Sequence, residues 1–317
     1  GARRSCSQWR SPCLPLLLLL LVLGGTTVSG FKICAYSVQN FNMAKASDSR
    51  LMHTLTRVLS RCDITLLQEV MDSDGKVIKS LMTSLNRYDE HKYQSVSSKS
   101  LGNTPGNMQQ YVFIYRKGTV NVTGQHQYQK QASFVREPFA VQFQSRRTAI
   151  KRFALVALHA EPGRTVEEID RLYDVFAEVS KKWNNTNVML LGNFHAGCAH
   201  MTRVDKKKIR LFKDSNYFWL IGDKVDTTVS EETNCPYDRC VIVVHGKSFL
   251  KAIAPFSAQV IDVSKKKKVF LSFCLTEISD HLPVQVTLKS SARLLQATPL
   301  LILFAVSVIV CSFLSPL

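Results

Sequence analysis

Short apolar segments, each followed by a polar loop, recur along the chain between residues 31 and 288. Runs of four to eight apolar residues that are rich in β-branched and aromatic side chains predict β-strands. Eight such runs are present, at residues 31–36, 64–67, 111–115, 139–143, 153–158, 188–191, 241–244 and 284–288. We therefore expect a protein built mainly on strands.

Helical spacing of apolar residues occurs at residues 49–60, 77–85 and, most clearly, 165–183. The last segment opens with Thr165 and early acidic residues and closes with Lys181 and Lys182, which suits the helix dipole. Its apolar side chains share one face, which we interpret as core and not as a binding stripe. They are Ile169, Leu172, Tyr173, Phe176 and Val179. Many strands with a few helices between them predict an α/β sandwich, with two stacked sheets and helices outside.

The first 30 residues have the pattern of a secretory signal peptide. A basic start with Arg3, Arg4 and Arg10 precedes the apolar run CLPLLLLLLVLGG, and the small residues of VSG stand before Phe31. A membrane anchor is the alternative, but the run is short for crossing a bilayer.

An uncharged apolar run also occupies residues 298–317, after the small residues 290–292 and a short spacer. This order is typical of the signal for a lipid (GPI) anchor. A membrane helix is the alternative, because the run approaches the roughly 20 residues that span a bilayer. No basic cluster follows the run, which favours the lipid anchor. We expect residues 31–291 to form one domain and residues 292–317 to be a hydrophobic tail. The protein is then a monomer that enters the endoplasmic reticulum and is secreted or anchored at the cell surface.

The body of the chain is strongly basic. The ends contain Arg3, Arg4, Arg10 and Arg293 and no acidic residue, so the 41 Lys and Arg less these four leave 37 against 24 acidic residues, a net charge of +13. Such an excess predicts a polyanionic partner, either nucleic acid or an anionic membrane surface. Lysine runs such as those at 206–208 and 265–268 also occur in ordinary solvated loops.

Export would allow disulfides to form. Cys34 and Cys62 lie in apolar segments and are interpreted as buried thiols. Cys198 and Cys235 lie in loop-like sequence and are better candidates for a bridge, although spacing alone does not determine pairing. Two Asn-X-Thr sequences fit the N-glycosylation pattern, at Asn121 and Asn184.

Polar residues cluster where the predicted strands end. They lie in QEV (68–70), LHAEPG (158–163), GNFHAGC (192–198), CPYDR (235–239) and ISDHLP (278–283). Glu69 is a candidate ligand for a hard divalent cation. Four further residues could form His–carboxylate pairs for general acid–base chemistry, namely His159, Asp238, Asp280 and His281. Phosphodiester cleavage needs a cation, a base and an acid, so the set predicts that chemistry if it converges in space.

Seven sequence blocks now point to a family. They are LLQEVMDS, REPFAVQF, LVALHAEPG, IDRLYDVFAEV, VMLLGNFHAGC, CPYDR and ISDHLPVQV. Their order resembles that of deoxyribonuclease I and its relatives, over nearly all of residues 31–288. The resemblance implies the four-layer α/β/β/α sandwich of the endonuclease/exonuclease/phosphatase fold. It also implies metal-dependent endonucleolytic hydrolysis of DNA, with Mg²⁺ at the catalytic site and structural Ca²⁺.

The resemblance assigns roles to the strand-end residues. Glu69 stands at the family's metal-binding glutamate, and His159 at its catalytic histidine. Asp238 matches the carboxylate that partners this histidine. Asp280 and His281 match the second Asp–His pair of the family.

Further matches concern binding and structure. Arg136 in REP stands at a phosphate-contacting arginine. Asp226 and Thr228 in DTT resemble part of a calcium loop. Cys198 and Cys235 stand at the family's main disulfide.

The chain departs from the family inside the site. The family reads GDFNAGC where this chain reads GNFHAGC, so Asn193 replaces an acid and His195 replaces an asparagine that orients the phosphate. Gln109 stands at a catalytic glutamate, and Ser37 at a phosphate-binding asparagine. A neutral amide is a poorer partner than a carboxylate for a hard cation or an imidazolium. Two further departures fall at DNA-contacting positions, at Met71 and Asn107.

Two functional hypotheses follow. The first is an exported or membrane-anchored deoxyribonuclease whose site is weakened by Asn193, His195 and Gln109. The second is a catalytically inactive member that retains the fold and binds DNA or another polyanion, because affinity for DNA rests mainly on phosphate charge.

Overall fold

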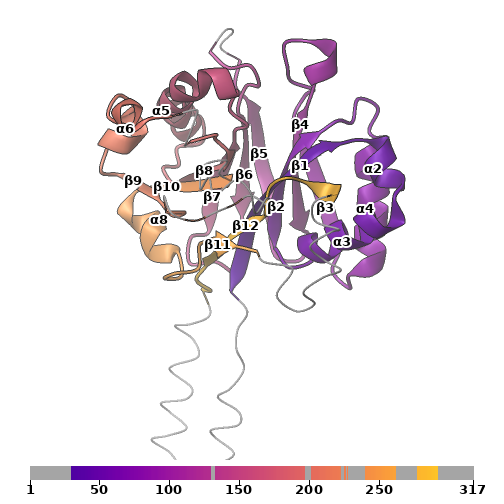
Figure 1. Cartoon of the computed structure of the whole chain (residues 1–317). Helices are drawn as coiled ribbons and strands as arrows, with labels where there is room; N and C mark the ends of the chain where they lie inside the picture. Colours follow the sequence, from indigo (N-terminus) through magenta and orange to yellow (C-terminus); the bar gives the residue numbers. More distant parts are fainter. Residues whose placement is uncertain are drawn as a thin grey trace, which may run out of the picture. The chain divides into compact units, whose positions relative to one another are not determined.

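Two six-stranded sheets dominate the computed structural model (Figure 1). The structure describes residues 30–129, 133–196, 201–222, 225, 227, 240–261 and 277–291. The first sheet has the order β11 (Gln259–Val260), β12 (Val284–Leu288), β1 (Phe31–Phe41), β2 (Ile64–Val70), β4 (Gln110–Arg116) and β3 (Tyr93–Ser97). The second has the order β5 (Asn121–Gln127), β6 (Phe139–Gln144), β7 (Arg152–Ala157), β8 (Val188–Asn193), β10 (Cys240–His245) and β9 (Tyr217–Trp219).

Helices cover the outer faces of both sheets, as Figure 1 shows. On the first sheet they are α2 (Met43–Ser47), α3 (Ser49–Leu59) and α4 (Lys76–Tyr88). Beside the second sheet lie α5 (Thr165–Trp183), α6 (Arg203–Lys206) and α7 (Arg210–Lys213), and α8 (Lys247–Ala252) follows β10. The four-layer α/β/β/α sandwich expected from the sequence is confirmed.

The alternation of side chains along β1 explains the layers, because successive residues of a strand point to opposite faces. Ile33 and Ala35 join the core between the sheets, whereas Cys34 and Tyr36 join the core beneath the helices. The helix α5 has the predicted bounds. Ile169, Leu172 and Val179 are buried as predicted, whereas Tyr173 and Phe176 are only partly buried against the same core.

Four strands were not predicted, and all four are sheet edges. They are β3, β5, β9 and β11. Strand β5 largely alternates between exposed and partly buried positions, β3 has one buried residue, Tyr93, and both strands carry few apolar side chains. An edge strand packs on fewer neighbours, so a search for apolar runs passes over it.

Cys34 and Cys62 form a disulfide, so their interpretation as buried thiols is wrong. Both are buried, as expected from the sequence. In the parallel register of β1 and β2, Cys34 lies opposite Thr65. Cys62 stands before the start of β2, and the bridge joins it to Cys34 with 6.2 Å between their Cα atoms.

Several predictions fall outside the described residues. They concern the signal segment 1–29, the tail 292–317, and Cys198, Asp226, Thr228, Cys235 and Asp238. In the described part of the chain, no helix is long and apolar enough to cross a bilayer. Asn121 and Asn184 are both exposed.

Candidate active site

One end of the two sheets gathers the predicted site residues, at the top of Figure 1. Strands β1, β2, β7 and β8 all run toward this end, and β4 starts from it. Ser37 and Glu69 lie near the ends of β1 and β2, and Gln109 precedes β4. His159 follows β7, and Asn193 ends β8.

Gln68 joins the two sheets beneath this site. Its Nε2 donates to the carbonyl of Leu158 at 2.7 Å, and its Oε1 accepts from the Asn193 N–H at 2.8 Å. The Gln68 side chain and the Leu158 carbonyl lie so close to the backbone of residue 192 that only glycine fits there. At this position φ is +138°, and a Cβ would collide with both groups. Gln68 thus fixes the end of β8, and with it Asn193, against β2.

His159 is held in one orientation by hydrogen bonds on two sides. Its backbone N–H donates to the Tyr111 hydroxyl at 2.9 Å, and its Nδ1 lies 3.0 Å from Gln109 Oε1. Gln109 Nε2 donates to Asn40 Oδ1 at 3.4 Å, so the amide oxygen is the atom that faces the ring. The His159 Nδ1 therefore carries the hydrogen, and its Nε2 carries the lone pair.

Burial lowers the pKa of His159 well below its usual range, and the charges of Arg136, His195 and His281 add to this shift. The ring is therefore neutral at neutral pH. Burial also raises the pKa of Tyr111, so its hydroxyl stays protonated and donates to the Arg136 carbonyl. The Nε2 of His159 lies 3.4 Å from the Nε2 of His195. A neutral imidazole whose Nε2 carries the lone pair can accept a proton from a nearby water.

Asn193 lies between two further histidines. Its Oδ1 accepts from the His195 backbone N–H at 3.2 Å, which turns Nδ2 toward His281 Nε2, also at 3.2 Å. An amide N–H donates only, so His281 Nε2 accepts here and its hydrogen lies on Nδ1. The Nδ1 of His281 is buried and has no hydrogen-bond partner among the described residues. Asp280 is half-exposed, and its Oδ1 lies 3.6 Å from His281 Nε2, beyond ordinary hydrogen-bond length.

Lys45 links the end of β1 to the segment that carries Asp280, and it was not predicted from the sequence. Its Nζ donates to the backbone carbonyls of Gln39 and of Ile278, the latter at 2.8 Å. Burial lowers the pKa of Lys45, and the negative charges of Glu69 and Asp280 oppose that shift. The sequence shows only that a lysine follows the end of a strand by a few residues. Its contact with the segment near Ile278 arises from the tertiary structure and could not be predicted from the sequence.

Glu69 fits the ligand chemistry of Mg²⁺. Its carboxylate is buried and accepts a hydrogen bond from the Ser37 hydroxyl through Oε1, while no described residue bonds to Oε2. Mg²⁺ typically takes one or two protein carboxylates and fills its other positions with water and substrate phosphate. Among the described residues, no group of three or more His, Cys, Asp and Glu side chains could hold a metal. Glu69 would thus be the main described ligand.

Arg136 is almost fully buried beside the site. Its Nη1 pairs with Glu161 Oε2 at 2.9 Å, and its Nε has no hydrogen-bond partner among the described residues. The sequence predicted contact with phosphate, and the structure places the guanidinium at the floor of the site, close enough to affect His159.

The backbone is strained at this end of the sheets. Four of the six described non-glycine residues with positive φ lie here, namely Gln39, Asn40, Glu69 and His195. Such conformations cost about 1–3 kcal/mol each and cluster at functional sites. Packing in the rest of the sandwich therefore offsets the conformational energy that the backbone of Glu69 and His195 costs.

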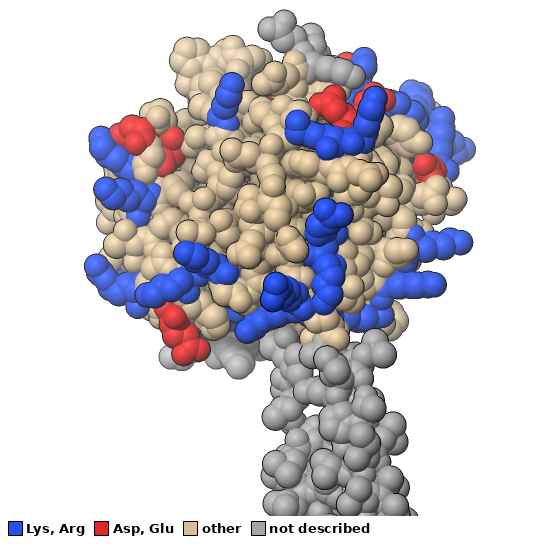
Figure 2. All heavy atoms as spheres, turned by 180° about the vertical axis from the view of Figure 1, so that it is seen from behind, with Lys and Arg blue, Asp and Glu red and all other residues tan. Residues whose placement is uncertain are grey.

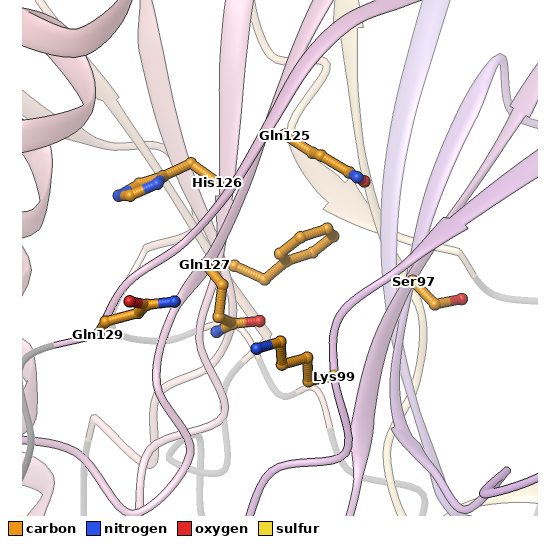
Figure 3. A pocket seen from close by; sticks show the side chains of 7 residues that line it. Ser97, Lys99, Gln125, His126, Gln127 and Gln129 are labelled. Carbon is orange, nitrogen blue, oxygen red and sulfur yellow. The ribbon is translucent and has the colours of Figure 1, made fainter.

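A separate pocket of about 400 Å³ lies where β3 of one sheet faces β5 of the other (Figure 3). All but one of the residues that line it have polar side chains, namely Ser97, Lys99, Gln125, His126, Gln127 and Gln129, and the other is Phe139. It contains none of the site residues predicted from the sequence.

Comparisons with known proteins agree with this geometry. The sequence pattern of the endonuclease/exonuclease/phosphatase family matches residues 34–244. Human deoxyribonuclease-1-like 1 is 39% identical over 306 residues, which cover 93% of this chain and 96% of the relative. Human deoxyribonuclease gamma is 38% identical over 284 residues, which cover 87% and 91%. An endonuclease/exonuclease/phosphatase from Bacteroides vulgatus has the same fold, with a TM-score of 0.57 at 12% identity, covering 83% of this chain and 100% of that structure.

Proposed function

Because this chain belongs to the endonuclease/exonuclease/phosphatase family and, within it, to the deoxyribonuclease I group, we propose that it cleaves DNA endonucleolytically in a Mg²⁺-dependent reaction centred on His159 and His281. It is a hydrolase of the nuclease type, and DNA is its substrate class. The observation that carries the proposed mechanism is the orientation of His159, whose Nε2 lone pair is set by the hydrogen bond from Nδ1 to Gln109.

The proposed reaction uses His159 as the base. A proton passes from the attacking water to His159 Nε2, and the Nδ1 hydrogen bond to Gln109 keeps the ring in place. The water oxygen bonds to phosphorus as the bond to the leaving oxygen breaks, and His281, which lies beside Asn193, would in its protonated form donate a proton to that oxygen. Mg²⁺ bound at Glu69 would supply positive charge to the phosphate oxygens.

The same geometry supports a weakened reaction. The imidazolium that forms at His159 would face the neutral oxygen of Gln109, and a hydrogen bond between neutral groups contributes about 1 kcal/mol less than one to a charged group. Asn193 presents an N–H to His281 and no negative charge. Both amides preserve position but stabilise the developing positive charges poorly.

Plasmid nicking by the purified protein with Mg²⁺ and Ca²⁺ tests this proposal. We expect slow nicking by the wild type, none by His159→Ala, and faster nicking by the double variant Asn193→Asp/His195→Asn. If wild type and His159→Ala are equally inert while the double variant cuts, the native chain is not an enzyme.

The second candidate function is binding of DNA without cleavage. The neutral side chains of Asn193 and Gln109 favour it, and so does the surface charge. Figure 2 shows Lys and Arg side chains spread widely over one face, with Asp and Glu at a few places only. Binding to phosphates predicts an affinity that falls steeply with salt, and an affinity unchanged between low and moderate salt would contradict it.

We also propose that the protein is exported and held at the cell surface. The Cys34–Cys62 disulfide fits an oxidising compartment, and the exposed Asn121 would be open to glycosylation. A phospholipase that cleaves lipid anchors should release the protein from cells. Retention after this treatment, with release by detergent alone, would favour a membrane helix. The structural Ca²⁺ implied by the resemblance stays a proposal, because Asp226 and Thr228 lie outside the described residues.

A further inference from the structure

Three segments of the chain form a basic surface at the end of the sandwich opposite the candidate active site. They are residues 145–151, 247–258 and 287–291, and backbone hydrogen bonds join them. The Ala149 N–H donates to the Lys289 carbonyl at 2.9 Å, and the Lys289 N–H donates to the Ala252 carbonyl at 2.8 Å. The three segments contain no Asp or Glu and six basic residues, namely Arg146, Arg147, Lys151, Lys247, Lys251 and Lys289. We call this surface the basic end.

The strands separate the basic end from the candidate active site. Strand β1 begins at Phe31, beside Leu288, and reaches Ser37 only after six further residues. Strand β7 begins directly after residue 151 and leads to His159. At about 3.3 Å per residue, these distances along the strands are roughly 20–25 Å. The side chains of the basic end therefore lie too far away to contact the phosphodiester at His159, and their charge calls for another partner. Figure 2 shows several Lys and Arg side chains on the lower part of the domain.

Phe256 adds an exposed aromatic ring to the basic end. Its relative exposure is 101%, the highest of the large apolar side chains among the described residues. Its φ is +55°, a conformation that glycine adopts easily and a bulky residue rarely does. A hollow of about 480 Å³ beside it is lined largely by apolar side chains, among them Leu250 and Ile253, and also by Lys289. An exposed aromatic ring next to basic side chains is typical of surfaces that lie in the interface of a bilayer.

The chain enters and leaves the domain at this same end. Phe31 pairs with Leu288, and residues 289–291 follow directly. The apolar run predicted as an anchor begins at residue 298, so only six residues separate it from residue 291. A chain of this length spans at most about 25 Å. A lipid anchor or a membrane helix in this part of the sequence would therefore hold the basic end close to the bilayer.

We propose that the basic end docks on a bilayer that contains anionic lipids, with Phe256 at the membrane interface and the candidate active site directed away from the membrane. The proposal rests on the anchoring proposed above. The tail would hold the protein on any bilayer, whereas docking needs negatively charged headgroups to pair with the six basic residues. Lipid composition would thus decide whether the domain moves freely on its tail or presents its site outward in one fixed orientation.

The predicted glycosylation site Asn121 lies at the border of this surface. It is opposite Gln144 on β5, which forms one edge of its sheet. Four strand spacings of about 4.8 Å separate β5 from β10, which α8 follows. A glycan at Asn121 would therefore stand roughly 19 Å to the side of the segment that carries Lys251 and Phe256.

Tryptophan fluorescence of the full-length protein tests the docking. Phe256→Trp places a probe on the basic end, and Val204→Trp is the matched control, because Val204 is 62% exposed on α6, away from that end (Figure 1). Each protein is reconstituted in phosphatidylcholine vesicles with and without phosphatidylserine, and both contain a spin-labelled lipid that quenches nearby tryptophan. The signal of the native tryptophans, measured in wild type, is subtracted. We expect phosphatidylserine to increase quenching at position 256 and to leave quenching at position 204 unchanged.

Charge variants, made in the Phe256→Trp protein, test which residues cause the docking. Each basic residue near an anionic bilayer strengthens binding about fivefold, so the loss of three should lower the ratio of docked to undocked protein about 100-fold. The test variant is Arg146→Gln/Arg147→Gln/Lys151→Gln, in which all three residues are exposed. A control that removes the same charge outside the basic end, and that should leave docking unchanged, is Lys206→Gln/Lys207→Gln/Lys208→Gln.

Three results would overturn the proposal. The first is quenching at position 256 that does not depend on phosphatidylserine, and the second is quenching that persists in the triple variant at residues 146, 147 and 151. The third is a triple variant that loses affinity for DNA while its quenching is unchanged, because the basic end would then bind nucleic acid. Flotation with phosphatidylcholine vesicles keeps docking and anchoring apart. Protein that floats without quenching at position 256 contradicts docking alone, and protein that binds only anionic vesicles, with quenching there, contradicts anchoring alone.

Discussion

Gln109→Glu should raise the proton affinity of His159 and speed the reaction. The amide oxygen of Gln109 accepts a hydrogen bond from His159 Nδ1 at 3.0 Å, and glutamate can occupy the same volume. The substitution changes the acceptor from neutral to negatively charged and restores the residue that the family resemblance places there. The bond from the backbone N–H of His159 to the Tyr111 hydroxyl holds the backbone of residue 159 in both proteins.

The magnitude follows from the type of hydrogen bond. A neutral hydrogen bond contributes about 0.5–1.5 kcal/mol, and one to a charged group about 1.5–3 kcal/mol. The simple Coulomb energy for unit charges 3.0 Å apart is larger, about 5 kcal/mol at an effective dielectric constant of about 20. Burial of the new carboxylate offsets much of this attraction. A net gain of about 1–1.5 kcal/mol for the protonated ring remains, which is roughly tenfold in its proton affinity.

An NMR titration of the His159 ring measures this effect directly. In the wild type, burial and the neighbouring positive charges lower the pKa of His159, so its titration lies at low pH. The variant should move the midpoint upward, and the nicking rate at neutral pH should rise about tenfold if imidazolium formation limits turnover. Gln110→Glu is the matched control, because it adds the same charge one residue along β4, on a side chain that bonds to Ser98. The reasoning is refuted if both variants shift the His159 midpoint equally or not at all.

Four further predictions concern stability, positioning and pH dependence. The double variant Cys34→Ala/Cys62→Ala should lose about 3–4 kcal/mol of unfolding free energy in urea, the value for a loop with 28 residues of sequence separation; an unchanged midpoint would show that the bridge adds nothing. Gln68→Leu leaves two buried backbone groups unpaired and should cost about 2–5 kcal/mol, whereas a loss below 0.5 kcal/mol would mean that another group replaces the amide. Lys45→Met should lower the nicking rate by a larger factor than it lowers the affinity for Mg²⁺, and Lys45→Arg should restore part of the rate. Equal nicking rates in wild type, Lys45→Met and Lys45→Arg would exclude a positioning role for Lys45. Folding lowers the pKa of His159, so as the pH falls the unfolded chain binds a proton at this histidine before the folded protein does. The unfolding free energy should therefore be constant above about pH 6.5 and should decrease below it by about 1.4 kcal/mol per pH unit. His159→Asn should remove this decrease.

The sequence predicts the centre of each sheet well and its edges poorly. Strands such as β1 and β8 are packed on both faces, so their apolar runs are unmistakable. The edge strand β5 has the sequence NVTGQHQ, whose polar residues face solvent, and only pairing with β6 makes it a strand. Hydrophobic pattern reports burial, and edge strands are only partly buried.

The site divides in a similar way. Strand ends that carry polar residues were recognisable along the chain, and His159 and Asn193 do meet at one end of the sheets. Gln68 was visible in QEV, but its importance depends on two hydrogen bonds that cross to the second sheet. Lys45 likewise acts on a carbonyl more than 200 residues away. Contacts of this kind follow from the packing of the two sheets, and no local pattern encodes them.

The altered residues of the site preserve geometry while they remove charge, and this explains how the fold and the activity can diverge. Gln109 holds His159 in one tautomer, and Asn193 holds His281 in one tautomer, each through a single amide whose other end is also bonded. A carboxylate at either position would keep these distances and also attract a proton to the ring. The amides therefore keep both rings in place but are poor partners for a developing positive charge. A carboxylate restored at Gln109 alone should therefore speed the reaction while it leaves the position of the His159 ring unchanged.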